Sequence, residues 1–191
     1  MVSAVATRSE LDALVGELDA VASEARREFG ALSARQLNWK PSADEWSVGQ
    51  CLEHLMKTNE GYFPRLEQLS KGEQASSAWE RLSPLSKFWG RTVLKFVAPG
   101  SARKVKARPG FLPSSSELGA DMVERFVAHQ RRLTELMRGT GGLDLERVVV
   151  TSPISGVVTY SLLDAYRIVV AHEQRHMAQA RRVTQSEGFP K

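Results

Sequence analysis

The chain has 191 residues, 42% of them hydrophobic, and a net charge of +4, which is the balance of a globular protein long enough to bury a core. The charge is weak and no basic run is interleaved with aromatics, so we expect no nucleic-acid partner. The sequence shows neither a long apolar run nor a signal-peptide pattern, so we expect no membrane partner. Cys51 is the single cysteine, so an internal disulfide is excluded and we expect a cytoplasmic protein.

Apolar residues recur at three- and four-residue steps along most of the chain, and this spacing predicts an all-α fold. The first such stretch covers residues 11–29. A second follows Ser47, which forms the pattern of a capping box with Gln50, and covers residues 48–69. Because a proline removes an internal hydrogen bond, we expect Pro64 to kink this helix.

Residues 73–113 are the least regular part of the chain. We expect an excursion over the mouth of the fold, with one or two short amphipathic helices within residues 79–96. Lys104, Lys106 and Arg108 then make a short basic segment. Such side chains are usually solvated, but they could also attract an anionic thiol.

A third helix is predicted after Ser114, which offers another capping box with Glu117. Its apolar stripe covers residues 118–136, and the glycine-containing segment 139–142 ends it. Residues 148–151 predict a short extended piece, too short to imply a sheet.

Thr159 or Ser161 is expected to cap a fourth helix that continues to Val183. Four long amphipathic helices with polar connections predict a single-domain four-helix bundle over residues 1–191. In such bundles, cofactor sites are built from side chains on facing helices.

Residues 172–176 of the fourth helix have the sequence H-E-x-x-H. Two imidazoles four residues apart rise by about 6 Å and share one helix face, which is a metal-ligand spacing. His54, at the edge of the apolar stripe of the second helix, is the expected third ligand beside His172 and His176. Three neutral imidazoles with an open position are typical of a catalytic metal centre.

Other polar residues near this motif allow more than one interpretation. Glu173 is either a proton acceptor or a structural anchor. Gln179 and Arg175 lie on the side of the histidine pair and could contact substrate, although Arg175 could equally be a solvated charge. Cys51 could be a ligand or a reactive thiol, but a small buried residue is the commoner case. His129, on the seam of the third helix, could pack in the core, support a ligand or be a fourth ligand.

Two other classes of metalloprotein use parts of this pattern. In a metalloprotease Glu173 would be the general base, but the long protease pattern needs Gly and His where this chain has Gln179 and Arg182. The protease is therefore a remote alternative. A di-iron carboxylate bundle needs a second Glu-x-x-His and two further helical glutamates, which are not evident, so a mononuclear site fits better.

Taken in order, several short motifs resemble the DinB/YfiT-like superfamily. The matching residues are Trp39-Lys40-Pro41, Trp46-Ser47-Val48, His54, the segment from Lys106 to Pro113, and His172, His176 and Gln179 in an H-x-x-x-H-x-x-Q pattern. The similarity covers residues 8–184, and the order and spacing of the motifs make it more specific than any one of them.

The resemblance implies a dimeric four-helix bundle with one divalent metal, zinc or nickel with manganese or iron as alternatives, held by His54, His172 and His176. Characterised relatives include thiol S-transferases that use bacillithiol, mycothiol or glutathione, and a mycothiol-dependent maleylpyruvate isomerase. We therefore expect a metal-dependent transferase or hydrolase on a small molecule, best a thiol S-transferase with a low-molecular-weight thiol cosubstrate. The alternatives are a non-catalytic metal-binding or stress-related dimeric module, and a dimerising scaffold in which the metal is incidental.

Overall fold

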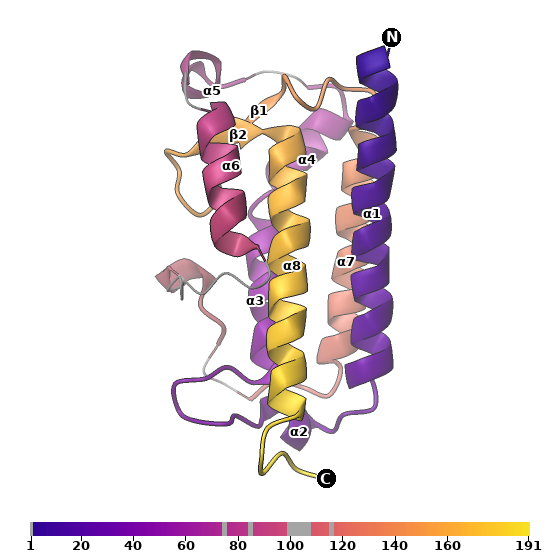
Figure 1. Ribbon diagram of the computed structural model, residues 1–191, viewed down its shortest axis with the longest axis vertical. Helices are drawn as coiled ribbons and strands as arrows, with labels where there is room; N and C mark the ends of the chain where they lie inside the picture. The colour runs from indigo at the N-terminus through magenta and orange to yellow at the C-terminus, as the bar shows by residue number, and fades with distance from the viewer. Residues whose placement is uncertain (1, 74–75, 84–85, 99–107, 115–116) are drawn as a thin grey trace.

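Four long helices lie side by side (Figure 1). The computed structural model describes residues 2–73, 76–83, 86–98, 108–114 and 117–191. The long helices are α1 (Val2–Phe29), α3 (Val48–Glu60), α7 (Met122–Gly139) and α8 (Leu162–Thr184). Both α1 and α3 pack against α7 and α8, so α3 and α8, which carry the predicted ligands, are neighbours.

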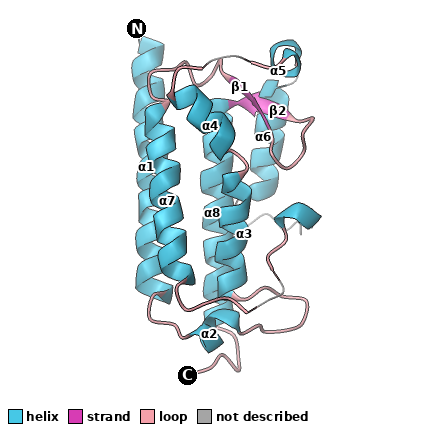
Figure 2. Ribbon diagram, turned by 180° about the vertical axis from the view of Figure 1, so that it is seen from behind, coloured by secondary structure: helices cyan, strands magenta, loops and turns pink. Residues whose placement is uncertain are grey.

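Shorter elements gather mainly at one end of the long helices. They are α2 (Ala34–Asn38), α4 (Phe63–Ser70), α5 (Ala78–Leu82), α6 (Ser86–Val97), the 3-10 helix η1 (Pro109–Phe111), β1 (Val149–Thr151) and β2 (Thr159–Ser161). Figure 2 shows both strands at the same end of the molecule as α5. The predicted excursion thus contains α5, α6 and η1, and α6 packs along α8.

The chain is mostly helical, but the all-α prediction is corrected by a small antiparallel sheet. β1 pairs with β2, and Val150 lies opposite Tyr160. The predicted extended piece therefore does have a partner, the three residues that lead directly into α8. Pairing of this kind depends on a contact between two strands across a loop. The short run of β-branched residues does not by itself reveal that contact.

Two predicted helix starts are confirmed. The Ser47 hydroxyl accepts a hydrogen bond from the Gln50 N–H at 3.1 Å, and the Gln50 side-chain oxygen accepts one from the Ser47 N–H at 3.2 Å. The Ser161 hydroxyl accepts from the Asp164 N–H at 3.0 Å and caps α8. These caps fix where α3 and α8 begin, and hence which face of each helix its histidines occupy.

Two other predicted features, the course of the second helix and the start of the third, differ in the structure. The second is not kinked but divided, since α3 ends at Glu60 and α4 begins at Phe63, with Pro64 in the first turn where its missing N–H costs nothing. The third begins at Met122 rather than after Ser114. Lys104 and Lys106 lie outside the described residues.

The apolar core is divided into two clusters by a polar layer. One cluster is centred on Leu18, Leu133 and Tyr166. The other is centred on Phe29, Leu52, Phe126, Met177 and their neighbours. Between them, buried Asn59, Gln130 and Glu173 approach one another from α3, α7 and α8. Among the described helices none is both long and apolar enough to cross a bilayer.

Candidate metal centre

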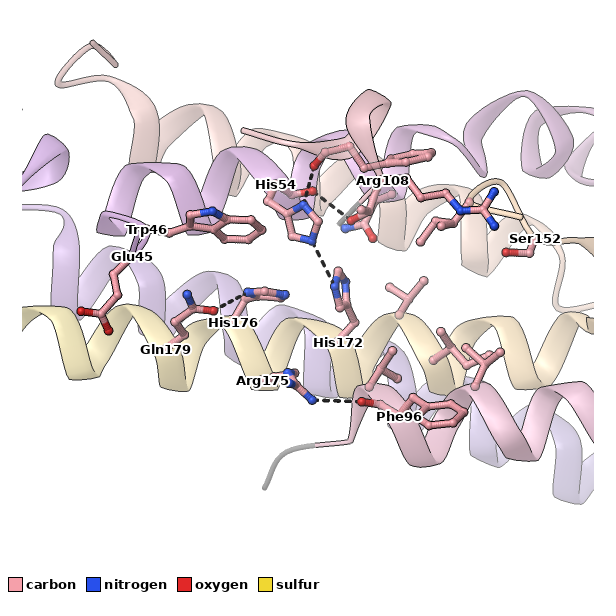
Figure 3. Close-up of a pocket in the computed structure, with 18 of the residues that line it drawn as sticks. Glu45, Trp46, His54, Phe96, Arg108, Ser152, His172, Arg175, His176 and Gln179 are labelled. Atoms are coloured by element: carbon pink, nitrogen blue, oxygen red, sulfur yellow. Dashed lines mark hydrogen bonds between the residues drawn. The ribbon is translucent and has the colours of Figure 1, made fainter. Parts of the chain in front are cut away.

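The three predicted ligand histidines converge between α3 and α8 (Figure 3). One ring nitrogen from each of His54, His172 and His176 lies within 4.8 Å of the other two. The Nε2 atoms of His54 and His172 are 3.3 Å apart. Because His54 is separated from the pair by more than a hundred residues, this convergence is a product of the fold rather than of local sequence.

Hydrogen bonds on the far side of two rings fix the tautomer of each. The Nδ1 atom of His54 lies 2.7 Å from the Phe111 carbonyl oxygen, which can only accept, so Nδ1 carries the proton. The Nδ1 atom of His176 lies 2.9 Å from Gln179 Oε1, with the same consequence. Both Nε2 atoms are therefore left as bare lone pairs, which is how ligating histidines are usually oriented.

Burial keeps these imidazoles in the neutral, ligating form. It lowers the pKa of His54, lowers that of His172 well below its ordinary value, and lowers that of His176 to about 3, with the neighbouring histidines adding to the last two effects. The bare Nε2 of His54 faces a second imidazole nitrogen, so the two atoms need a shared cation or proton between them. Three neutral nitrogen donors fit zinc or nickel, and the residues present therefore suit the metal that the family resemblance implies.

Trp46 forms one wall of the centre, a role that the sequence analysis did not assign to it. Its ring stacks on His176 with centroids 5.6 Å apart and lies 4.8 Å from the ring of His54. Trp39, in contrast, contacts Phe189 near the C-terminus. The signal available in the sequence was the position of Trp46 directly before the Ser47 cap, which anchors it to the start of α3.

Residues 108–114, which we call the strap, are fastened to one face of α3. Four α3 side chains spaced as neighbours on that face bind its backbone or its serine: Gln50 and Glu53 bind Ser114, His54 binds Phe111, and Lys57 binds Leu112. Glu53 accepts from the Ser114 N–H at 2.6 Å and from its hydroxyl at 3.0 Å. The strap therefore presents the Phe111 carbonyl to His54.

Glu173, although it lies between the two histidines in sequence, faces away from them. Its Oε1 atom accepts hydrogen bonds from Asn59 at 2.7 Å and Gln130 at 2.6 Å. The side chain is fully buried, and burial raises its pKa to about 7. Its Oε2 atom has no hydrogen-bond partner among the described residues. The carboxyl group thus joins α8 to α3 and α7 in the polar layer.

The other candidate residues fall in different places. Gln179 binds His176, and Arg175 donates to the Phe96 carbonyl at 2.9 Å, which ties α8 to α6. Cys51 is buried among apolar side chains, and burial raises its pKa to about 12, so it is a poor thiolate. His129 stacks on Phe63 and lies apart from the three clustered histidines.

A cavity of about 600 Å³ opens beside the three histidines. His54, His172, His176, Arg175 and Gln179 all line it. Its size is within the range of sites that hold small organic ligands. The histidines thus face a space in which a small molecule could reach them.

Residues 7–180 match the DinB superfamily. The chain belongs to this superfamily. It is also similar to the uncharacterized protein YuaE of Bacillus subtilis (strain 168), with 26% identity over 161 residues that cover 84% of this chain and 90% of YuaE. No solved structure gives a significant match. The predicted family is therefore confirmed.

Proposed function

We propose that this DinB superfamily member is a metal-dependent enzyme in which His54, His172 and His176 hold one divalent cation. The observation that carries the proposal is the convergence of three neutral imidazoles, two of them with Nε2 lone pairs fixed by hydrogen bonds at Nδ1. Zinc or nickel suits this donor set, with manganese or iron as weaker candidates. The adjacent cavity favours a small-molecule substrate over a polymer.

The reaction that we infer is a thiol S-transfer. A divalent cation bound here would lower the pKa of a coordinated thiol and so supply a nucleophile near neutral pH. The sulfur forms a bond to an electrophilic carbon, the leaving group departs with the bonding electron pair, and the thiol proton passes to solvent. Trp46 shields the histidines from water, Gln179 orients His176, and Arg175 contributes a positive charge to the cavity wall.

Two alternative functions receive less support. In a metalloprotease Glu173 would have to reach a water molecule between metal and substrate, whereas its carboxyl group is engaged with Asn59 and Gln130. A non-catalytic metal-binding or stress-related module would keep the histidines but would not require the cavity. We also propose that the helices form one four-helix bundle domain that dimerises and acts in the cytoplasm, as the family resemblance implies.

Elemental analysis of protein purified without a histidine tag tests the metal centre. We expect close to one equivalent of zinc or nickel per chain, lost in His54→Ala. His129→Gln is the matched control, because it removes a buried histidine outside the cluster and should leave the metal in place. Metal-free wild-type protein that takes up no divalent cation on titration would remove the proposal.

The reaction is tested by incubating metal-loaded protein with an electrophile and, in turn, bacillithiol, mycothiol and glutathione. We expect loss of free thiol with at least one of them, and no turnover by His54→Ala. A metal-loaded wild type that turns over none of the thiols would leave the non-catalytic module as the better reading. Peptide cleavage abolished by Glu173→Gln would instead favour the protease.

A further inference from the structure

The cavity beside the histidines has two chemically different parts, which lie on either side of them along α8. Figure 3 shows Ser152 on one side and Glu45 and Gln179 on the other. The part that we call the inner lobe is lined mainly by apolar or hydroxyl-bearing side chains: Tyr62, Val93, Val97, Ser152, Tyr160 and Val169. Arg108, which is exposed, also lines the cavity on this side (Figure 3). The part that we call the outer lobe is lined by charged or amide side chains: Asp44, Glu45, Gln179 and Arg182.

The two lobes also differ in their contact with water. In the inner lobe, Tyr160 is 1% exposed and Val169 is 4% exposed. In the outer lobe, Glu45 and Arg182 are both exposed. Burying a charge beside Tyr160 and Val169 would cost its hydration free energy, because the cation on this side, Arg108, is itself exposed to solvent, whereas burying an apolar group there is favourable.

A buried chain of hydroxyl groups gives the inner lobe one polar feature. The Tyr62 and Tyr160 hydroxyls are 2.5 Å apart, and Ser152 lines the same part of the cavity. Burial raises the pKa of both phenols, so each keeps its proton. Two phenol hydroxyls joined by one hydrogen bond have two protons, and the chain therefore has one O–H left to donate to a group in the cavity.

We propose that the inner lobe binds an uncharged, apolar group that carries one hydrogen-bond acceptor, such as a carbonyl oxygen. The hydroxyl chain would donate to that acceptor, and Val93, Val97 and Val169 would surround the apolar body. The assignment of the electrophilic substrate to the inner lobe rests on the proposed thiol transfer. The charged outer lobe would then bind the thiol cosubstrate. The binding itself requires no cation.

Three small aromatic probes test the proposal: acetophenone, which has the acceptor, toluene, which lacks it, and benzoate, which is charged. Each is titrated by calorimetry or ligand-observed NMR into zinc-loaded protein and into protein stripped of metal with EDTA. We expect acetophenone and toluene to bind both forms. Benzoate should not compete with either of them in the stripped protein, because the exposed Arg108 on this side offers its carboxylate only a solvent-screened charge.

Variants then locate the binding. Val93→Phe and Val97→Phe replace partly buried residues, fill the lobe, and should each weaken both neutral probes by about tenfold or more. The double variant Tyr62→Phe, Tyr160→Phe removes both phenol hydroxyls without changing shape and should weaken acetophenone alone, by about fivefold. Arg182→Gln, in the outer lobe, is the control and should change neither affinity.

The outcomes separate this proposal from the proposed enzyme. No binding of acetophenone or toluene to wild-type protein would overturn it, as would benzoate binding as tightly as acetophenone and being lost in both valine variants. Equal weakening of both neutral probes by the double tyrosine variant would overturn the hydrogen-bonding part. A protein that binds no zinc but keeps the expected probe pattern would remove the enzyme and leave the inner lobe standing.

Discussion

At residues 172–176, two faces of α8 carry polar side chains in opposite electrostatic surroundings. On the cavity face, the Nε2 atoms of His54 and His172 lie 3.3 Å apart, and burial lowers the pKa of both imidazoles, which keeps them uncharged. On the core face, Glu173 meets amide donors from Asn59 and Gln130. The first face brings neutral nitrogen donors together without a positive charge, whereas on the second the Glu173 Oε1 atom has its own amide donors. A metal site is therefore defined by ligand atoms that converge from facing helices, and not by a five-letter motif.

The largest expected effect contrasts the two faces directly. His172→Ala removes a ligand and should lower zinc affinity about a hundredfold or more, because each ligand supplies a large share of the binding free energy. Glu173→Gln keeps the shape of the core face and should change zinc affinity by less than about threefold. Competition with a chromophoric chelator measures both. Equal losses in the two variants would mean that Glu173 belongs to the metal centre after all.

The second prediction concerns stability, to which we expect the core face of α8 to contribute more than the cavity face. Glu173→Ala leaves the Asn59 and Gln130 amides without their acceptor and opens a cavity, so we expect the free energy of unfolding to fall by about 3 kcal/mol. Denaturant unfolding of metal-free protein measures it. Gln174→Ala, on the neighbouring position of α8, is the control and should cost less than about 0.5 kcal/mol. A Glu173→Ala variant as stable as this control would contradict the structural role of the carboxyl group.

The sequence predicted the cavity face far better than the core face. His54, His172 and His176 could be found because the i, i+4 spacing and the family motifs are local signals, and the Ser47 and Ser161 caps fix where their helices begin. The direction of Glu173 could not be found, because it depends on Asn59 and Gln130. Their positions follow from how three helices pack, which no spacing within one helix determines.

The fold shows the same division between local and distant signals. The helical periodicity was sufficient for the long helices, but the pairing of β1 with β2 depends on a contact between segments apart in the chain. Ser114 is the clearest case. Its pattern with Glu117 resembled a capping box, yet its hydroxyl and N–H are taken by Glu53 of α3. A local capping preference was overridden by a tertiary partner.

A third prediction concerns His129, which lies outside the cluster of three histidines and whose titration affects stability alone. Burial, with a smaller effect of Arg132, lowers the pKa of His129 from 6.5 to about 4, and Glu60 is its nearest anion at 3.9 Å. Because this folded-state pKa lies below the unfolded value, the unfolded chain binds more protons between these values. The free energy of unfolding should therefore fall by about 2 kcal/mol between about pH 8 and about pH 5 on account of His129.

His129→Leu isolates this contribution, since the other groups titrate alike in both proteins. We expect the stability difference between wild type and variant to shift by about 2 kcal/mol over that pH range in the variant's favour on acidification. Denaturant midpoints of metal-free protein at several pH values measure the difference. A pH-independent difference would show that His129 titrates normally and is solvated, contrary to its stacked position on Phe63.

The smallest effect concerns the strap, which supports the cavity face and does not touch the core face. Ser114→Ala removes the hydroxyl that donates to the Glu53 carboxylate and should loosen the Phe111 carbonyl that orients His54. Losing such support typically lowers metal affinity about tenfold, with no change in the stability of metal-free protein beyond about 0.5 kcal/mol. Lys57→Met removes a strap contact at Leu112 that lies farther from the His54 ring and should cost less than about threefold. If Ser114→Ala keeps the wild-type zinc affinity, His54 holds its orientation through packing against Trp46 alone, and the strap is then a cover for the cavity and no part of the metal centre.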